Sequence, residues 1–204
     1  MDKKEHWNDI YKRKSYAEVT WFQREPKMSL DLIRGLHLND HANIIDVGAG
    51  SSTLVDFLIK DNFQSIYLLD LSLMAFDQSK KRLGGNSKFI NWIEGDVCHF
   101  KSSQKFDLWH DRAVFHFLTK VEDQDNYLTS LNRSLNVGAY FIISAFAEDG
   151  PSKCSGLEIV RYAKNELIDK IGFNFELINF QKEAHISLGG LEQKFNYWVF
   201  KKVK

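Results

Sequence analysis

Four successive apolar segments of the chain each end in acidic or imidazole side chains. Asp46 precedes a Gly48-Ala49-Gly50 turn, Asp70 ends the next segment, and Asp96 follows the third. The fourth segment ends in His110-Asp111-Arg112. Charged groups beside buried strands need ligands or partners, and the carboxyl ends of parallel strands meet at one edge of a sheet. We therefore expect these groups to surround one ligand-binding crevice.

The glycine turn predicts a nucleotide-like ligand. A strand that ends in Gly-x-Gly and leads into a helix brings backbone very close to such a ligand. Asp70 follows the turn by about 20 residues, the spacing at which an acid on the second strand reaches ribose hydroxyls. Two alternatives stay open: the glycines form only a tight connection, or Asp70 caps the helix that begins near Ser72. Ser72 is the better cap, which leaves Asp70 for the ligand.

Two residues near the turn indicate the kind of ligand. Thr53 stands where the dinucleotide pattern G-x-G-x-x-G has its third glycine, and it would crowd a diphosphate. Asp46 places a carboxylate at the strand end, where an ammonium group is a better neighbour than a phosphate. S-adenosylmethionine has an adenosine ribose and an ammonium group but no phosphate, and so satisfies both conditions. We also expect Ala49 and Leu71, beside the turn and Asp70, to contact it.

His110, Asp111 and His116 are candidate acid–base or substrate-orienting groups. They follow the fourth strand and should face the reacting end of the pocket. Histidine is suited to removing a proton near neutral pH. A structural role inside the core is the alternative for each of them. Arg112 either clamps a substrate carboxylate or pairs with Asp111.

Trp21 and Phe22 are candidates for an aromatic lid. A ring beside a sulfonium attracts it through its π-face, whereas the alternative is that the two rings only anchor the N-terminal helices. Cys154 lies in a loop after the fifth strand that we interpret as solvated rather than as a substrate lid. Cys98 and Cys154 lack metal-ligand spacing, and no cluster of His, Cys and Asp predicts a metal site.

Apolar strands alternate with helical segments from residue 43 onward, which favours a parallel sheet with helices on both faces. Near the end, two strands joined across Gly189-Gly190 predict an antiparallel hairpin. We expect one domain over 1–204, with 1–40 as a helical cap and 41–204 as a Rossmann-like core. The expected strands are 43–47, 65–70, 88–93, 106–110, 139–145, 173–180 and 195–200. The expected core helices are 51–60, 72–83, a stretch that runs through 131, and 164–171.

Composition narrows the class of protein. The 204 residues are 44% hydrophobic and 26% charged, which is typical of soluble globular proteins. Twenty-seven basic residues balance 27 acidic ones, so no net field favours nucleic acid or anionic lipid as a partner. No apolar run approaches the roughly 18 residues of a membrane span, and no signal segment is seen at the N-terminus. We expect a cytoplasmic protein, and the oligomeric state does not follow from the sequence.

The order of these motifs resembles that of class I S-adenosylmethionine-dependent methyltransferases over roughly residues 40 to 204. The resemblance implies a three-layer α/β fold with a seven-stranded, mostly parallel sheet and an antiparallel last strand. It also implies that Asp46 lies near the methionine ammonium, Asp70 at the ribose, and Asp96 with Val97 at adenine. Ser52 departs from the family, many members of which have a third glycine there. The motifs are Asp46-x-Gly48-x-Gly50, Asp70, Gly95-Asp96-Val97, Phe106-Asp107-Leu108 and the terminal hairpin.

Two kinds of small methyltransferase are similar in the segments His6-Trp7-x-x-x-Tyr11, Trp21-Phe22-Gln23 and His110–Ala113. One is the thiopurine methyltransferase-like group, which acts on small soft nucleophiles, and the other is a group of protein lysine methyltransferases. The expected function is methyl transfer from S-adenosylmethionine to a small molecule or a protein, with S-adenosylhomocysteine as product. An NAD(P)-dependent oxidoreductase and a non-catalytic nucleotide-binding module are the alternatives.

Overall fold

A computed structural model describes residues 2–204. The helices are α1 (Lys3–Arg13), α2 (Lys27–Arg34), α3 (Leu54–Lys60), α4 (Leu73–Leu83), α5 (Val121–Ser134) and α6 (Lys164–Ile171). The strands are β1 (Asn43–Val47), β2 (Ser65–Asp70), β3 (Ile90–Glu94), β4 (Phe106–Arg112), β5 (Leu135–Phe146), β6 (Lys153–Cys154), β7 (Leu157–Glu158), β8 (Phe175–Ile186) and β9 (Glu192–Lys202). Short 3-10 helices are η1 (Gly84–Phe89), η2 (Val97–His99) and η3 (Phe115–Phe117).

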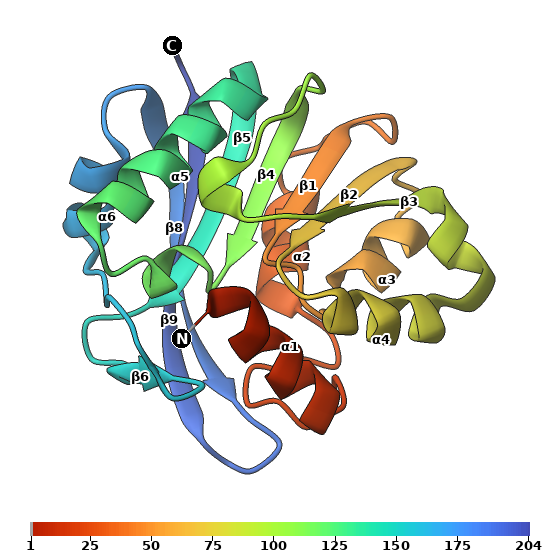
Figure 1. The fold of residues 1–204 in the computed structure, drawn as a ribbon. Coiled ribbons are helices and arrows are strands. Elements are labelled where there is room, and N and C mark those ends of the chain that lie inside the picture. The colour runs from red at the N-terminus through yellow and green to blue at the C-terminus, as the bar shows by residue number, and fades with distance from the viewer. Residues whose placement is uncertain (1) are drawn as a thin grey trace.

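The main sheet has seven strands in the order β3-β2-β1-β4-β5-β9-β8 (Figure 1). Strands β1 to β5 run parallel, whereas β9 lies antiparallel between β5 and β8. Helices cover both faces of the sheet, because its strands are apolar on both sides. The predicted fold, a mostly parallel seven-stranded sheet with an antiparallel C-terminal hairpin, is confirmed. Only β6 and β7 stand apart, as a small hairpin of their own.

The two faces of β4 carry different groups, because successive side chains of a strand point to opposite sides. Leu108 packs in the core on the side of α2 and α3, and His110 follows it on that side. Trp109 packs in the core on the side of α5, and Asp111 follows it there. The pattern of β4 therefore separates His110 from Asp111, although the two are adjacent in the sequence.

Several boundaries differ from the sequence-based expectation. The helix expected from residue 51 begins at Leu54, because 51–53 still belong to the turn. The helix expected after the fourth strand begins only at Val121, since η3 comes first. Gly138, the expected turn before the fifth strand, lies inside β5 with φ of 89°. The β6–β7 hairpin was not predicted, because two-residue strands are too short to show a period.

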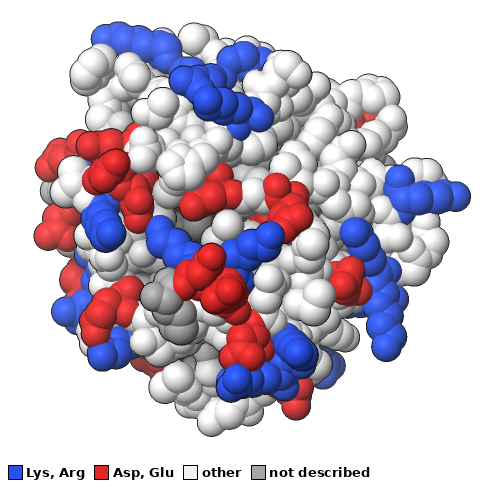
Figure 2. Space-filling view, viewed as in Figure 1, with Lys and Arg blue, Asp and Glu red and all other residues white. Residues whose placement is uncertain are grey.

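Surface charges of both signs are interspersed on the face drawn in Figure 2. Several charged side chains of the protein form ion pairs, such as Lys3–Asp123 at 2.8 Å and Lys194–Asp149 at 2.6 Å. Within residues 2–204, none of the helices has the length and apolar character needed to cross a membrane.

Candidate functional site

A pocket lies at the carboxyl ends of β1, β2 and β4, and residues of α1 and of the loop that follows α1 line it as well. Helix α1 lies beside that end of the sheet (Figure 1). Gly50 of the turn does not line the pocket but holds one of its acids, as described below. Of the predicted catalytic residues only His110 lines the pocket. The predicted cofactor-binding residues that line it are Trp21, Asp46, Gly48, Ala49, Asp70, Leu71, Asp96 and Val97.

Asp70 ties the end of β2 to the glycine turn. Its Oδ2 accepts a hydrogen bond from the Gly50 N–H at 2.7 Å, and its Oδ1 accepts one from the Ser72 N–H at 2.7 Å. Burial raises the pKa of Asp70 to about 6, although these two hydrogen bonds oppose the rise. Ser72 is the cap of α4, as expected, because its hydroxyl accepts from the Ala75 N–H at 3.2 Å. Asp70 is thus oriented by backbone while still facing the pocket.

The glycine turn has a shape that no larger residue fits. Gly48 and Gly50 have φ of 58° and 52°, the left-handed region that favours glycine. A Cβ on Gly48 would lie 2.0 Å from Val114 Cγ2, and one on Gly50 would lie 2.3 Å from the Tyr11 hydroxyl. The turn is therefore packed between η3 on one side and α1 on the other.

Arg82 of α4 binds the backbone that follows the two glycines of the turn. Its guanidinium donates to the carbonyl oxygens of Ser51 at 2.9 Å and Ser52 at 2.6 Å. The same group pairs with Asp56 of α3 at 2.9 Å and lies over the Tyr16 ring. Nothing in the sequence near the turn indicates this contact, because about 30 residues separate the partners.

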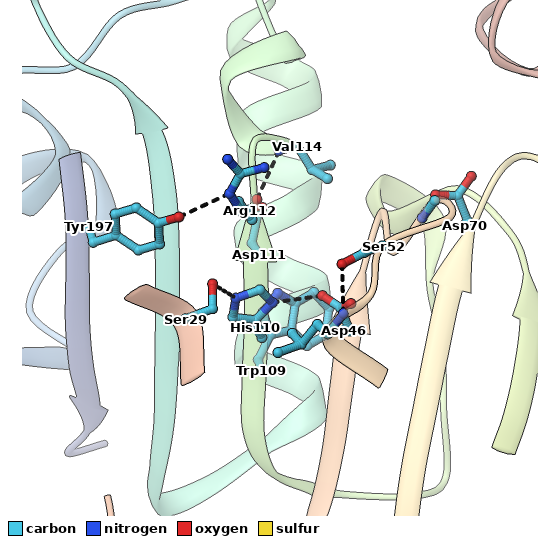
Figure 3. A network of polar contacts seen from close by, with 12 residues as sticks. Ser29, Asp46, Ser52, Asp70, Trp109, His110, Asp111, Arg112, Val114 and Tyr197 are labelled. Atoms are coloured by element: carbon cyan, nitrogen blue, oxygen red, sulfur yellow. Dashed lines mark hydrogen bonds and ion pairs between the residues drawn. The ribbon is translucent and has the colours of Figure 1, made fainter. Parts of the chain in front are cut away.

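Asp46 is part of a buried chain of hydrogen bonds (Figure 3). Its Oδ1 lies 2.7 Å from His110 Nδ1, and His110 Nε2 lies 2.9 Å from the Ser29 hydroxyl. Parallel pairing of β1 with β4 places Asp46 and His110 directly opposite each other. A neutral imidazole satisfies both contacts, since Nδ1–H donates to the carboxylate and Nε2 accepts from the hydroxyl. Both nitrogens of His110 are thus already engaged.

Asp96 and Val97 lie where the chain leaves β3. Asp96 caps η2, because its Oδ1 accepts from the Cys98 N–H at 2.8 Å. Its side chain lines the pocket together with Val97 and with Lys3, whose ammonium pairs with Asp123 at 2.8 Å.

Asp111 does not face the pocket, contrary to the expectation from the sequence. It is fully buried on the α5 side of the sheet, where it accepts from the Tyr127 hydroxyl at 2.7 Å. It also accepts from the backbone N–H groups of Val114 and Phe115, at 2.9 and 3.2 Å. Burial raises the pKa of Asp111 to about 6. These contacts order the chain after β4.

His116 also lies outside the pocket lining, which corrects the expectation that it faces the reacting end. It is fully buried between the rings of Phe117 and Phe146, at centroid distances of 4.4 and 4.8 Å. Burial, with a further contribution from the charge of Arg112, lowers the pKa of His116 to about 3. The imidazole is therefore neutral near pH 7 and packs as an aromatic ring.

Residues 20–23, which we call the strap, pass over the pocket and are tied down from several elements. Thr53 Oγ1 donates to the Gln23 carbonyl at 2.8 Å, and Gln23 Nε2 donates to Glu183 at 3.0 Å. His185 Nε2 lies 2.9 Å from the Thr20 carbonyl, and Arg112 Nη1 donates to the Trp21 carbonyl at 3.2 Å.

The C-terminal hairpin is a part of the site that the sequence did not indicate. Its strands β8 and β9 supply Glu183, His185 and Tyr197, and Tyr197 accepts from Arg112 Nε at 3.0 Å (Figure 3). These contacts join residues 85 to 165 positions apart, which no local pattern predicts.

Aromatic rings form much of the pocket wall. Trp7 of α1 contacts Trp21 and Phe117 edge to face, at centroid distances of 6.0 and 5.1 Å. Such edge-to-face pairs hold rings in fixed orientations. Phe22 lines the pocket as well, so both expected lid residues border it.

A family model described as a methyltransferase domain matches residues 45–141. That segment contains the glycine turn, Asp70, Asp96 and the end of β4. This chain thus matches the expectation of a class I S-adenosylmethionine-dependent methyltransferase over the segment that carries those motifs. Its methyl donor is S-adenosylmethionine.

Relatives and solved structures that are similar to this chain match between 51% and 99% of its length. EEF1A lysine methyltransferase 2 of Mus musculus is 24% identical over 92% of this chain and 77% of its own. Malonyl-[acyl-carrier protein] O-methyltransferase 1 of Ilyobacter polytropus is 30% identical over 51% of this chain and 38% of its own. The N-methyltransferase NodS of Bradyrhizobium japonicum, solved with S-adenosylhomocysteine, shares the fold with a TM-score of 0.76 and 14% identity, over 98% of this chain and 100% of that one. A methyltransferase of Anabaena variabilis has a TM-score of 0.78 and 16% identity, over 99% of this chain and 96% of that one.

Proposed function

We propose that Asp70 binds the ribose hydroxyls of S-adenosylmethionine, Asp96 and Val97 contact its adenine, and Asp46 lies near its ammonium group. The hydrogen bonding of Asp70 carries this proposal. An ionised carboxylate accepts at about four positions, and backbone N–H groups occupy one on each oxygen. Each oxygen therefore keeps an acceptor position for one hydroxyl of a vicinal diol.

The rest of the pocket fits this ligand. Asp46 brings a carboxylate that is 3% exposed, and its partner His110 leaves Oδ2 without a contact to the imidazole. The turn at Gly48 and Gly50 exposes backbone rather than side chain, which permits close approach. When bound, S-adenosylmethionine supplies an electrophilic methyl group on a sulfonium.

We call the acceptor half the part of the pocket that lies on the β4 and β5 side of Asp46. It is formed by β4, by segments that follow β4 in the chain, and by the strap. The residues that we assign to it include no carboxylate and no imidazole; His110, which also lines the pocket from β4, has both ring nitrogens bonded to Asp46 and Ser29. We infer that the chain acts mainly by aligning the nucleophile, since orientation alone supplies much of a barrier reduction, and that no side chain there removes a proton. The acceptor half consists of Trp21, Arg112, Phe146, Cys154, Leu157 and Phe195.

We propose a small molecule as the methyl acceptor. The strap covers the acceptor half and is held by four side-chain hydrogen bonds from β4, β8 and the turn before α3. A covered, aromatic chamber suits a compact acceptor. A lysine of a protein is the second candidate, which the relative named EEF1A lysine methyltransferase 2 favours.

Transfer of a radiolabelled methyl group into a fractionated cell lysate tests this function. The full chain should label low-mass compounds in a reaction that the Asp70→Ala variant does not support. Label confined to protein bands would favour lysine methylation instead. Absence of label above the Asp70→Ala background in every fraction would contradict the proposed site.

A further inference from the structure

Arg112 carries a buried donor that the protein does not use. Its Nε donates to Tyr197 and its Nη1 to the Trp21 carbonyl, while the guanidinium lies 4.7 Å from the Phe195 ring centroid. Its Nη2 is shielded from solvent and has no hydrogen-bond partner within residues 2–204. A buried N–H without an acceptor is unfavourable, so this atom favours any ligand that brings an oxygen to it.

Arg112 also lacks a carboxylate partner. Among the residues of 2–204 that line the pocket, the other cation is Lys3, which pairs with Asp123 on the Asp96 side. The three carboxylates that line the pocket have other partners: Asp46 bonds to His110, and Asp70 and Asp96 accept from backbone N–H groups. Glu183 forms no ion pair with Arg112 within residues 2–204; the Tyr197 hydroxyl lies between them, accepting from Arg112 and donating to Glu183 at 3.0 Å.

The positive charge of Arg112 affects two nearby histidines. Besides burial, the charge of Arg112 contributes to the lowered pKa of His116 and of His185. These directions place the Arg112 charge within electrostatic reach of both imidazoles, although Glu183 acts on His185 in the opposite sense.

We propose that Arg112 binds a carboxylate of the methyl acceptor, so that the substrate class is a small aromatic or apolar acid. This inference rests on the proposed function, because it assigns the acceptor half of the same pocket. Sheet order places Arg112 on β4, two strands from Asp70 on β2 and on the side of β5 and β9. The guanidinium therefore stands at the end of the pocket opposite the proposed adenosine contacts.

The apolar walls of the acceptor half and the positive charge of Arg112 together favour one class of ligand. Phe146, Leu157 and Phe195 offer apolar contact and no hydrogen-bonding side-chain group. An ammonium group beside the guanidinium would be repelled. A phosphate would bring a second negative charge with no second cation to meet it, whereas a carboxylate is a monoanion that a guanidinium binds well.

Reaching Nη2 requires a small adjustment. The atom is shielded, and the hydrogen bonds from Nε and Nη1 are single contacts of 3.0 and 3.2 Å. A turn of the guanidinium or a shift of the strap brings Nη2 to the pocket when the acid enters.

Three probes that share a phenyl ring test the proposal: the anion phenylacetate, the neutral phenylacetamide and the cation benzylamine. Their affinities are measured by tryptophan fluorescence on the full chain saturated with S-adenosylhomocysteine, since Trp7 and Trp21 line the pocket. We expect phenylacetate to bind at least about 10-fold more tightly than phenylacetamide, and benzylamine to bind most weakly. The preference should vanish in Arg112→Gln, persist in part in Arg112→Lys, and be unchanged in the exposed control Arg133→Gln.

Equal binding of the anion and the amide, no binding of phenylacetate, or a preference that survives in Arg112→Gln would overturn the proposal. If Arg112 only holds the strap, Arg112→Gln will weaken all three probes alike. A separate titration with S-adenosylhomocysteine keeps the two proposals apart. If that ligand fails to bind the wild-type chain, the cofactor site is wrong; if it binds and phenylacetate does not, only the role of Arg112 is wrong.

Discussion

At the scale of single residues, we propose that His110 holds Asp46 in place rather than acting on a substrate. The imidazole is 2% exposed, and both of its nitrogens are bonded, to Asp46 and to Ser29. Removing the hydrogen-bond donor of a buried carboxylate leaves that charge unsatisfied. We therefore interpret His110 as a positioning residue, which fixes the carboxylate at the end of β1.

Replacing His110 should cost much more stability than replacing Ser29. For His110→Leu we expect a loss of about 3 kcal/mol or more in the free energy of unfolding, because the buried carboxylate of Asp46 loses its hydrogen-bond donor. For Ser29→Ala we expect only about 0.5–1.5 kcal/mol, the value of one neutral hydrogen bond. Chemical denaturation monitored by fluorescence measures both. Equal, small losses would show that the imidazole does not stabilise the Asp46 charge.

At the scale of elements, the glycine turn and α1 are built to fit each other. Tyr11 of α1 is buried, and its hydroxyl occupies the space where a Cβ of Gly50 would lie. The packing of α1 therefore requires a glycine at position 50, and α1 shields the turn from solvent.

This fit predicts a partial rescue between two substitutions. Gly50→Ala should lower stability strongly, since it adds a clash at 2.3 Å to a backbone with φ of 52°. Adding Tyr11→Phe removes the clashing hydroxyl but leaves the backbone strain of about 1–2 kcal/mol. The double variant should therefore be more stable than Gly50→Ala alone, as thermal unfolding would measure. Strictly additive losses would mean that the two residues do not touch.

The sequence predicted those features of the site that are local in the chain. Asp46, the turn and Asp70 follow strands with a recognisable period, so their common edge could be inferred. The contacts of Glu183 and His185 with the strap could not be inferred, because they depend on where β8 and β9 lie in the sheet. His116 was misplaced for a related reason: the chain after β4 forms the short 3-10 helix η3, not an α-helix, and the imidazole is buried in the core.

At the scale of the whole molecule, buried titratable groups couple stability to pH. The folded His116 keeps a pKa of about 3, below its ordinary value of 6.5. The unfolded chain therefore binds a proton between these values that the folded chain does not, and stability falls as pH falls. Asp70 and Asp111 act in the opposite sense, because their pKa values of about 6 lie above the ordinary 3.8.

Removing His116 should isolate its share of this dependence. Between about pH 6 and pH 4, the unfolding free energy of the wild-type chain should fall relative to His116→Gln by roughly 1.4 kcal/mol per pH unit. The contributions of Asp70 and Asp111 are common to both proteins and cancel in the difference. Denaturation curves at a series of pH values measure it. A constant difference across that range would mean that His116 titrates normally in the folded chain.

The central claim, that Asp70 holds the adenosyl group in this pocket, is tested most directly by calorimetric titration with S-adenosylhomocysteine. We predict binding that weakens as pH falls through about 6, where Asp70 takes up a proton. Asp70→Ala should bind at least about 10-fold more weakly, because charge-assisted hydrogen bonds are lost. The exposed Asp77→Ala should bind like the wild type. Unchanged affinity in Asp70→Ala, or binding of NAD⁺ in place of S-adenosylhomocysteine, would contradict the account.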